Sequence, residues 1–537
     1  MSDVKEEKAL EKLGAFEIGF KMLDLAKNND KQNVFLNAGR GNPNWIQTIS
    51  RAAFARLVQF GIKESKRTIS KKDLAGYTEK EGIYERLETF LNPDKNEEDK
   101  FLLDSVKLVH DKFNFNKDDF VKEWVDGVIG NNYPVPSRIL NYTEKIVNEY
   151  LSSVLYHNNT SLKDETELFA TEGATAAIVY IFNSLKENKL IHPGDKIIIN
   201  TPIFTPYIQI PELADYEMSE VDLQSKEENN WELSAESIEK LQDKDAKALF
   251  LVNPSNPGSV SLGTKALEAI KDAVKKNPDL MIITDDVYGP FTDDFQSIYS
   301  VVPYNTLLVY SYSKLFGVTG WRIGVIAAHE NNVFDDLIAK LPEDDKKVLY
   351  RRYRHVVLEP DKMKFIDRMV ADSRAIGLYH TAGLSTPQQI MLNLFALAHL
   401  LNVQNDGENN DHYIKEAREL VRKRYDDLHS GLGLKAFDDP TNARYYSLID
   451  VYKLAEQYYD KPFSDWLRNN FEQIDFLMQL SKKNGVVLLD GVGFGTKPGI
   501  LRVSQANLPN EDYGMIARQI KDLMKDYHDK YLKEQNE

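Results

Sequence analysis

The chain has 537 residues, of which 42% are hydrophobic and 28% charged, and its formal net charge is -16. This length allows more than one domain, and the excess of acidic residues argues against a nucleic-acid partner, which needs clustered positive charge. Because the sequence has no cysteine, disulfides, zinc–thiolate sites and thiol nucleophiles are excluded, and a reducing compartment is indicated.

Neither a membrane partner nor a metal is indicated. The first residues of the chain are charged and lack the continuous apolar stretch of a signal peptide. No apolar run reaches the roughly 18–20 residues that a membrane span needs. The ten histidines show no HExxH or other ligand spacing, so we expect no metal site.

The N-terminal part of the chain is predicted to be helical. Residues 1–60 are typical of an N-terminal arm and a helix, which we assign together with part of a small domain. Residues 91–138 are rich in charged residues and predict a helical insertion.

The middle of the chain alternates short apolar runs with helical patterns. The segment "LFATEGATAAIVYIFNSL" (168–185) predicts a strand, a glycine turn and a helix, and residues 260–277 predict an amphipathic helix. Four further apolar runs predict buried strands: 195–200, 246–253, 279–284 and 306–311. Near-continuous apolar strands separated by helices indicate an α/β fold whose parallel sheet is covered on both faces. Ligands of such sheets bind at the carboxyl ends of the strands.

The C-terminal part has a different pattern. Residues 330–380 predict a second helical insertion. Beyond about residue 400, helical patterns give way to "ARYYSLIDV" (443–451) and "GVVLLDG" (485–491), which predict strands. We therefore assign a large domain to residues 61–395 and a smaller α+β domain to residues 396–537.

Lys314 is the first candidate for a catalytic residue. It lies just beyond the predicted strand 306–311, with Arg322 eight residues further on. A lysine in such a place is by itself typical of a surface. However, an amine held behind a strand and near fixed cations has its pKa lowered by desolvation and like charge. A Schiff-base lysine requires such a lowered pKa.

A second group of residues could hold a pyridine ring. Asp285 ends the apolar run of "IITDDVYGPF"; it could cap a loop, or as a buried carboxylate hold the proton of a pyridinium, which makes the ring an electron sink. Asn256, in "VNPSNPGS", fits a turn and could also donate to a phenolate oxygen on the ring. Phe204, in "TPIFTPY", is typical of a core residue and could instead stack on the ring.

A phosphate site is indicated at the start of the first helix after the strand near 168. Gly173 and Ala174 lie there in "TEGATAAI", where free N–H groups and the helix dipole favour an anion. Glycine-rich turns are common by themselves, but Ser311, Ser313 and Arg322 would complete such a site.

In chain order these residues form a helix-terminus phosphate site, an aromatic residue, Asn-Pro, Asp-x-x-Tyr, Ser-x-x-Lys and an arginine eight residues later. This order and spacing resemble the fold-type-I pyridoxal-phosphate enzymes of the aspartate aminotransferase family, over roughly residues 30–525. The resemblance implies a mostly parallel seven-stranded sheet, a smaller α+β domain and pyridoxal 5'-phosphate as the cofactor. It also implies that Lys314 binds the cofactor covalently and that Asp285 is the partner of the pyridine nitrogen.

The same resemblance assigns four more residues. Tyr288 and Asn256 would bond the ring oxygen of the cofactor. Tyr77, in "AGYTEKEG", would reach the phosphate in the neighbouring subunit, and Arg502, in "LRVSQANLP", would bind the α-carboxylate of the substrate.

Three further segments are similar to the aspartate 4-decarboxylases: "NAGRGNPNW" (37–45), "NNYPVPSR" (131–138) and "ADSRAIGLYHTAGLSTPQQ" (371–389). This resemblance implies β-decarboxylation of L-aspartate to L-alanine and carbon dioxide, with slower transamination, and 2-oxo acids such as pyruvate as substrates that restore the cofactor. Gly39, Arg40 and Tyr133 would then contact the substrate, and Arg374 would act in catalysis. Each of the last three residues also has a structural interpretation: Arg40 would lie in a turn, Tyr133 would pack against its neighbours, and Arg374 would be a charge on a helix surface.

Two other functions are alternatives to this one. The first is a plain aminotransferase for aspartate or a related amino acid. The second is a non-catalytic pyridoxal-phosphate-binding regulator, which would carry a DNA-binding module with basic helices, whereas the N-terminus here is short and acidic. The decarboxylase resemblance further implies a cytoplasmic homodimer with shared active sites that assembles into a dodecamer.

Overall fold

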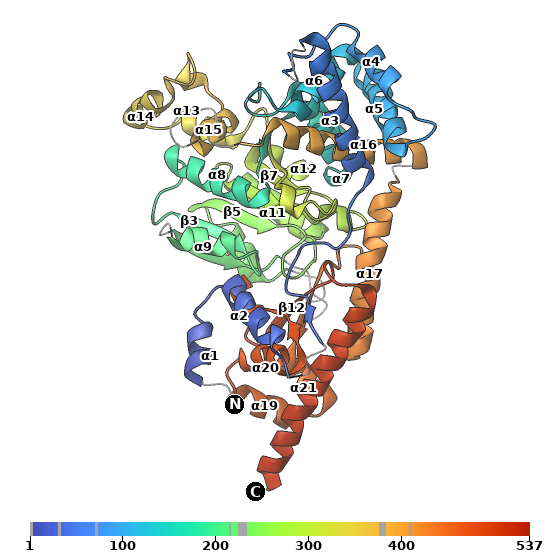
Figure 1. The fold of residues 1–537 in the computed structure, drawn as a ribbon. Coiled ribbons are helices and arrows are strands. Elements are labelled where there is room, and N and C mark those ends of the chain that lie inside the picture. The colour runs from blue at the N-terminus through green and yellow to red at the C-terminus, as the bar shows by residue number, and fades with distance from the viewer. Residues whose placement is uncertain are drawn as a thin grey trace.

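The computed structural model describes residues 4–30, 34–69, 74–157, 159–213, 216–223, 233–374, 383–407 and 410–536. Its centre is a seven-stranded sheet in the order β2-β8-β7-β6-β5-β3-β4 (Figure 1). The strands are β2 (Thr166–Thr171), β3 (Lys196–Asn200), β4 (Glu217–Val221), β5 (Ala246–Val252), β6 (Met281–Asp285), β7 (Thr306–Ser311) and β8 (Gly324–His329). β8 runs antiparallel to β2 and β7, and the other neighbouring strands are parallel. The predicted α/β fold with a mostly parallel seven-stranded sheet is therefore confirmed.

Both faces of this sheet are covered, because its central strands carry apolar residues on both sides. In β5, Phe250 belongs to one hydrophobic core and Leu251 to another, since successive side chains of a strand point to opposite faces. The first face is covered by α8 (Ala174–Glu187), where Phe182 stacks on Phe250 with ring centroids 4.5 Å apart. The second face is covered by α11 (Thr264–Lys276). Shorter helices connect the strands: α9 (Pro206–Leu213), α10 (Ala235–Leu241) and α12 (Ile298–Val301).

A group of helices extends the large unit at one end of the sheet (Figure 1). Its members are α3 (Ile49–Thr68), α4 (Ile83–Phe90), α5 (Glu97–Phe113), α6 (Lys117–Ile129), α7 (Asn141–Leu155) and α16 (Thr386–Asp406). The predicted insertion 91–138 forms α5 and α6, which pack against α3 and α16. Trp124 of α6 is fully buried, and its Nε1 donates to Asn393 Oδ1 at 2.9 Å. This insertion therefore shares the core of the large unit.

The second predicted insertion, 330–380, is also helical where the structure describes it. It contains α13 (Val333–Ala339), α14 (Glu343–Tyr353) and α15 (Phe365–Ser373). Here α15 packs against α8 and β2. Residues 375–382 lie outside the described residues.

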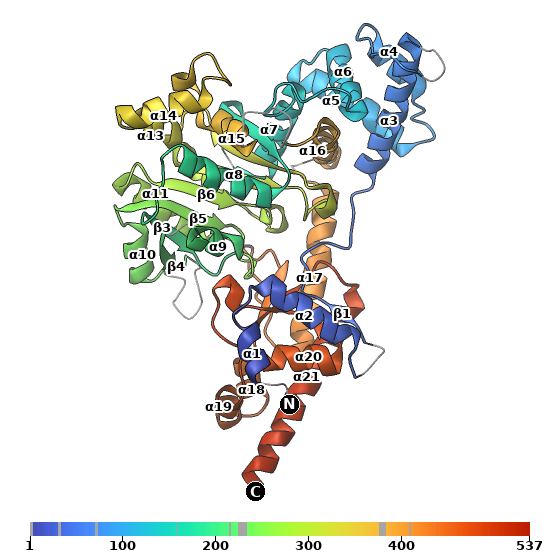
Figure 2. The same ribbon diagram turned by 60° about the vertical axis from the view of Figure 1, so that its left-hand side comes forward.

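A second, smaller unit is built around the antiparallel sheet β11-β12-β9. Its strands are β9 (Tyr446–Asp450), β10 (Val486–Val487), β11 (Leu489–Asp490) and β12 (Ile500–Ser504), and its helices are α17 (His412–Leu432), α18 (Val451–Tyr458), α19 (Lys461–Asn470), α20 (Asp475–Asn484) and α21 (Asn510–Asn536). The N-terminal elements α1 (Val4–Leu10), α2 (Ala15–Lys27) and β1 (Leu36–Asn37) join this unit, because β1 pairs with β10 and α2 shares its core. Figure 2 shows α1 and α2 among these C-terminal elements.

The predicted domain boundaries at residues 60 and 395 fall inside α3 and α16. Phe60 and Phe395 are both buried in the core of the large unit, so a boundary at either residue would divide one packed helix. We propose instead that the large unit begins with α3. The long α17 then joins the two units, since Val421 lies in the large core and Leu428 in the small one.

No helix in the described part of the chain is both long enough and apolar enough to cross a membrane.

Candidate active site

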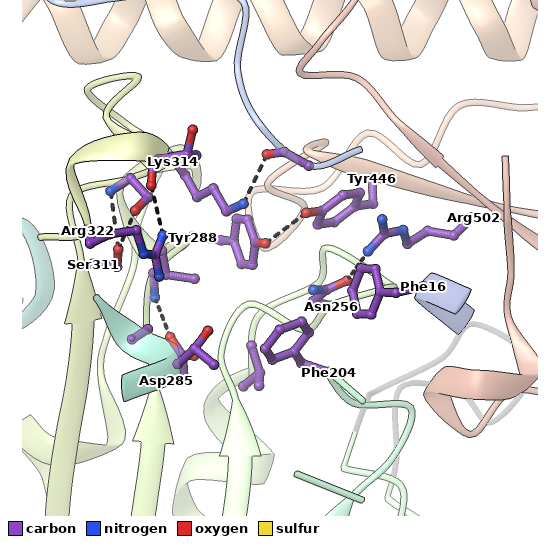
Figure 3. A pocket seen from close by; sticks show the side chains of 17 residues that line it. Phe16, Phe204, Asn256, Asp285, Tyr288, Ser311, Lys314, Arg322, Tyr446 and Arg502 are labelled. Atoms are coloured by element: carbon purple, nitrogen blue, oxygen red, sulfur yellow. Dashed lines mark hydrogen bonds between the residues drawn. The ribbon is translucent and has the colours of Figure 1, made fainter. Parts of the chain in front are cut away.

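A pocket lies between the carboxyl ends of β5, β6 and β7 and the small unit (Figure 3). Parallel sheets bind their ligands at this edge, where the polar residues that follow each strand come together. Ten residues singled out in the sequence line it: Ala174, Phe204, Asn256, Asp285, Tyr288, Ser311, Ser313, Lys314, Arg322 and Arg502. The sequence therefore predicted most of this pocket.

Lys314 presents its amine to the pocket from the turn after β7. Its Nζ donates to the carbonyl oxygen of Gly41 at 3.0 Å. Burial lowers the pKa of Lys314, and the nearby guanidinium groups of Arg502 and Arg322 lower it further, against the opposing effects of Tyr446 and Asp285. An amine with a lowered pKa is neutral in a larger fraction of molecules at neutral pH, and the neutral form is the nucleophile and the base.

Asp285 forms the floor of the pocket at the end of β6. It is only 3% exposed, and burial raises its pKa to about 7, although the backbone N–H of Val287, 3.3 Å from Oδ1, and the charge of Lys314 act in the opposite direction. A carboxyl with a pKa in this range becomes charged when a cation is placed beside it. Asp285 can therefore bind a ring nitrogen that carries a proton.

A candidate anion site lies at the N-terminus of α8. Gly173 precedes this helix with φ 87°, a conformation that glycine adopts readily. A Cβ at Gly173 would lie 2.8 Å from Arg322 Nη2, so the guanidinium approaches the backbone closely. Ser311 Oγ donates to Ser313 Oγ at 2.8 Å on the neighbouring wall. Free helix N–H groups, hydroxyls and an arginine together suit a phosphate.

Arg502 lies on the opposite side of the pocket, on β12 of the small unit. It is 1% exposed, and it donates from Nη1 to Asn256 Oδ1 at 2.9 Å and from Nη2 to Gly39 O at 2.7 Å. Its Nε is buried without a hydrogen-bond partner in the described residues. Burial lowers the pKa of Arg502, but arginine stays charged at neutral pH because its ordinary pKa is so high. The pocket thus offers a fixed cation to a carboxylate.

Several pocket residues were missed by the sequence analysis: Phe16, Gly41, Thr175, Val252, Val287, Thr319 and Tyr446. Tyr446 is the most informative of them, because its hydroxyl lies 2.9 Å from the hydroxyl of Tyr288. The segment that contains it was predicted as a strand, and the alternation of side chains along that strand was the available signal for an inward-facing tyrosine. Gly41 acts through its backbone, which leaves no side-chain signal in the sequence.

Two predicted substrate contacts lie beside the pocket. Gly39 is buried and reaches it only through the carbonyl oxygen that accepts from Arg502. Arg40 is exposed and lines a neighbouring groove that shares Phe16 and Gly41 with the pocket. Within one chain, Arg40 is therefore next to the pocket but does not line it.

Three other predicted residues do not line the pocket of their own chain. Tyr77 is 71% exposed and Tyr133 is 64% exposed. Arg374, whose predicted catalytic role stays a prediction, lies at the C-terminus of α15, where it is buried and donates from Nη1 to Val370 O at 3.0 Å. The same carbonyl also accepts from Ser373 Oγ at 2.7 Å, and Arg374 Nη2 donates to Ser137 O at 3.4 Å.

In the described ranges there is no group of three or more His, Asp or Glu side chains arranged to hold a metal ion. The polar groups of the pocket are suited instead to an organic cofactor with a phosphate and a protonated ring.

Comparison with known proteins gives three similarities. The chain matches the family model of aminotransferase class I and II over residues 130–520. It is 42% identical over 531 residues to a bifunctional aspartate aminotransferase and L-aspartate beta-decarboxylase from a Pseudomonas species, a match that covers 98% of both chains. It is 32% identical over 180 residues to aromatic-amino-acid aminotransferase 2 of Thermococcus litoralis, which covers 32% of this chain and 44% of that protein.

Solved structures show the same fold. Aspartate aminotransferase from Thermus thermophilus with maleate superimposes with a TM-score of 0.59 and 18% sequence identity, covering 97% of this chain and 100% of that chain.

Proposed function

This chain belongs to the class I and II aminotransferases, and we propose that it removes the β-carboxylate of L-aspartate as carbon dioxide and releases L-alanine, with slower aspartate aminotransferase activity. The predicted resemblance to the aspartate 4-decarboxylases is confirmed by the similarity to the bifunctional Pseudomonas protein. The predicted cofactor, pyridoxal 5'-phosphate, is confirmed by the family.

The decarboxylase proposal rests on the extent of the similarity between this chain and the bifunctional Pseudomonas protein. It covers 98% of both chains and therefore includes both helical insertions. The similarity to the Thermococcus aromatic aminotransferase covers only 32% of this chain. The insertions are thus shared with a relative named for decarboxylation.

The pocket fits the cofactor group by group. The buried carboxyl of Asp285 suits the protonated ring nitrogen, and the N-terminus of α8 with Arg322 suits the phosphate. Asn256 accepts from Arg502 through Oδ1, which leaves its amide nitrogen, like the hydroxyl of Tyr288, to donate to the ring oxygen. When bound, pyridoxal phosphate supplies a ring that accepts the electron pair left when a bond at the substrate α-carbon breaks.

The residues of the chain then supply proton transfer and substrate binding. We propose that Lys314, with its lowered pKa, moves the proton at the α-carbon. Arg502 binds the α-carboxylate with two parallel N–H donors. In the overall reaction the bond between the β-carbon and its carboxylate breaks, and its electron pair forms a bond to a proton at the β-carbon, so one proton is consumed for each carbon dioxide released.

The β-carboxylate should be held more loosely than the α-carboxylate. A cation fixed on the leaving carboxylate would stabilise the ground state and slow decarboxylation. Arg40 lies beside the pocket rather than in it, which suits a weaker contact. We propose that Arg40 influences the β-carboxylate, while the roles of Tyr133 and Arg374 stay predictions.

The proposed assembly is a homodimer with shared active sites that forms a dodecamer. Tyr77 is exposed in one chain, which suits the predicted contact with the phosphate in the neighbouring subunit. We further propose that 2-oxo acids such as pyruvate restore the cofactor after transamination, and that the enzyme works in the cytoplasm.

A plain aspartate aminotransferase is the alternative, because Lys314, Asp285 and Arg502 would serve transamination equally well. Product analysis separates the two. The purified holoenzyme is given L-aspartate with a trace of pyruvate, and carbon dioxide, alanine and oxaloacetate are measured, with Lys314→Ala as the control. Alanine and carbon dioxide in equal amounts, far above the pyruvate added, would support decarboxylation. Oxaloacetate formed in step with consumed pyruvate, without carbon dioxide, would establish the aminotransferase instead.

A further inference from the structure

We propose that the hydroxyl of Tyr446 is a positioning group that connects the substrate-binding Arg502 to Tyr288, and thereby controls how readily the linkage between Lys314 and the cofactor gives up its proton. The inference rests on the proposed function, because it requires Lys314 to bind the cofactor covalently. It adds a residue of the small unit to the groups that act on the cofactor.

The first observation is a hydrogen bond between the two structural units. Tyr446 is the first residue of β9 in the small unit and is 2% exposed, whereas Tyr288 follows β6 in the large sheet. Their hydroxyl oxygens are 2.9 Å apart, and their rings meet edge to face with centroids 5.5 Å apart (Figure 3). A buried tyrosine hydroxyl needs such a partner. The bond therefore holds the hydroxyl that faces the cofactor ring in one orientation.

The second observation concerns Gly41, which lies beside both Tyr446 and Lys314. A Cβ at Gly41 would lie 2.2 Å from Tyr446 Oη and 3.3 Å from Lys314 Nζ, so both polar atoms lie close to one point. The Gly41 carbonyl accepts from Lys314 Nζ at 3.0 Å and from the hydroxyl of Tyr445 at 2.8 Å. A side chain at position 41 would separate the Tyr446 hydroxyl from the amine.

The third observation connects Tyr446 to the substrate side. The guanidinium carbon of Arg502 lies 4.3 Å from the centroid of the Tyr446 ring. A cation over the face of a phenol attracts electron density from the ring and makes the hydroxyl a stronger hydrogen-bond donor. A carboxylate bound to Arg502 would weaken this effect. Hydrogen bonds in a chain polarise one another, so the change would pass from Tyr446 to Tyr288.

Four charged or titratable groups surround the Lys314 amine: Asp285 from β6, Arg322 from the segment before β8, Tyr446 from β9 and Arg502 from β12. Two of the four, Tyr446 and Arg502, belong to the small unit. The Tyr446–Tyr288 hydrogen bond stabilises negative charge on the ring oxygen of the cofactor, and this charge is greatest when the linkage has lost its proton. Removing the Tyr446 hydroxyl should therefore raise the pKa of the linkage.

The test is an absorbance titration of the cofactor-loaded enzyme, since the protonated and unprotonated linkages absorb at different wavelengths. Tyr446→Phe keeps the ring under Arg502 and removes only the hydroxyl. We expect its titration midpoint to lie about half a pH unit above that of the wild type. Succinate, which has two carboxylates and no amine, should shift the midpoint of the wild type more than that of Tyr446→Phe.

Two further variants test the route of the effect. In a Tyr288→Phe background, Tyr446→Phe should cause no additional shift, because Tyr446 acts through Tyr288. Tyr310→Phe is the matched control: Tyr310 is also buried and its hydroxyl lies 2.6 Å from that of Tyr150, but it does not line the pocket. Its midpoint should equal that of the wild type.

The outcomes separate the inference from the proposed function. A Tyr446→Phe enzyme that keeps the linkage but titrates like the wild type would overturn the inference, and so would an equal shift in the Tyr288→Phe background. If borohydride fails to attach the cofactor to Lys314 in the wild type, both the proposed function and the inference are wrong.

Discussion

The two walls of the pocket are built in different ways. On the sheet side, Asp285 ends β6 and Lys314 follows β7, and both strands are buried on both faces within a hydrogen-bonded ladder. On the opposite side, Tyr446 and Arg502 come from the three-stranded sheet of the small unit, and Gly41 comes from the segment after β1. The groups proposed to face the cofactor are thus fixed by one continuous sheet, whereas those proposed to face the substrate come from separate segments.

Three hydrogen bonds connect these walls. They join Lys314 to Gly41, Tyr288 to Tyr446, and Asn256 to Arg502. Each joins a residue positioned by the large sheet to one held by the small unit. The difference between the walls suggests that changes on the sheet side should abolish the chemistry, and that changes on the opposite side should weaken substrate binding or positioning.

The largest effect is expected on the sheet side. Lys314→Ala removes the amine that binds the cofactor and moves the α-proton, so alanine formation should fall at least about 10³-fold. The loss should be in kcat, measured with saturating aspartate and pyridoxal phosphate. Lys340→Ala is the control, since Lys340 is exposed, pairs with Asp279 and does not line the pocket. A Lys314→Ala enzyme with a tenth of the wild-type rate would contradict the assignment.

A smaller effect is expected from Arg502 on the opposite wall. Lysine at this position keeps the charge but loses the two-pronged donor geometry and the bonds to Asn256 and Gly39. We expect kcat/KM for aspartate to fall about 10²-fold in Arg502→Lys, mainly through KM, because the α-carboxylate is bound in both the ground and the transition state. Arg468→Lys is the control, because Arg468 does not line the pocket. Its guanidinium carbon lies 4.6 Å from the centroid of the Tyr452 ring, and the variant should leave kcat/KM unchanged.

A substitution at Gly41 tests whether the opposite wall depends on the close approach of the Gly41 backbone to Tyr446 and Lys314. In Gly41→Ala the new Cβ would lie 2.2 Å from Tyr446 Oη, so the tyrosine or the segment must move. We expect kcat/KM to fall about 10-fold, as a displaced positioning group would cause. Gly514→Ala, where the nearest atom is 3.9 Å away, should have the wild-type value.

A second change sharpens the Gly41 experiment. Combining Gly41→Ala with Tyr446→Phe removes the atom that clashes, so the double variant should lose less than the product of the two single losses. Strictly multiplicative losses would show that Gly41 is required for another reason.

The contrast between the walls also explains what the sequence could predict. Asp285, Ser311 and Lys314 follow apolar runs that are typical of buried parallel strands, and such strand ends meet at one edge. Gly41 contributes a carbonyl oxygen, and Tyr446 enters the pocket through the register of β9 with β12. Neither contribution has a local pattern that separates it from an ordinary glycine turn or core tyrosine.

The catalytic role of Arg374 stays a prediction, because its segment alone does not settle what the side chain does. Its segment resembles that of the decarboxylases, yet the side chain bonds to the carbonyl of Val370 at the end of α15. An arginine near a helix C-terminus is also favoured by the helix dipole, so its position in the sequence fits a structural role as well as a catalytic one. The predicted domain boundaries fall inside α3 and α16 for a related reason, because the apolar patterns of these helices do not indicate which core each helix joins.

The smallest effect on catalysis is expected one residue beyond the site on the sheet side. Asp286 is buried next to Asp285, its carboxylate accepts from Thr284 Oγ1 at 2.5 Å, and burial raises its pKa to about 7. Between about pH 4 and pH 7 the folded protein therefore keeps a proton on Asp286 that the unfolded chain has lost, so the stability contributed by this group falls as pH rises.

Asp286→Asn keeps an oxygen acceptor for Thr284 and cannot ionise. Relative to the wild type, the free energy of unfolding of the variant should increase across this pH range by an amount on the order of 4 kcal/mol. Urea unfolding of both proteins at several pH values measures this difference, which should be absent below about pH 4, where Asp286 is protonated in both states. A difference that stays constant between pH 4 and pH 7 would mean that Asp286 is already charged in the folded protein over this range.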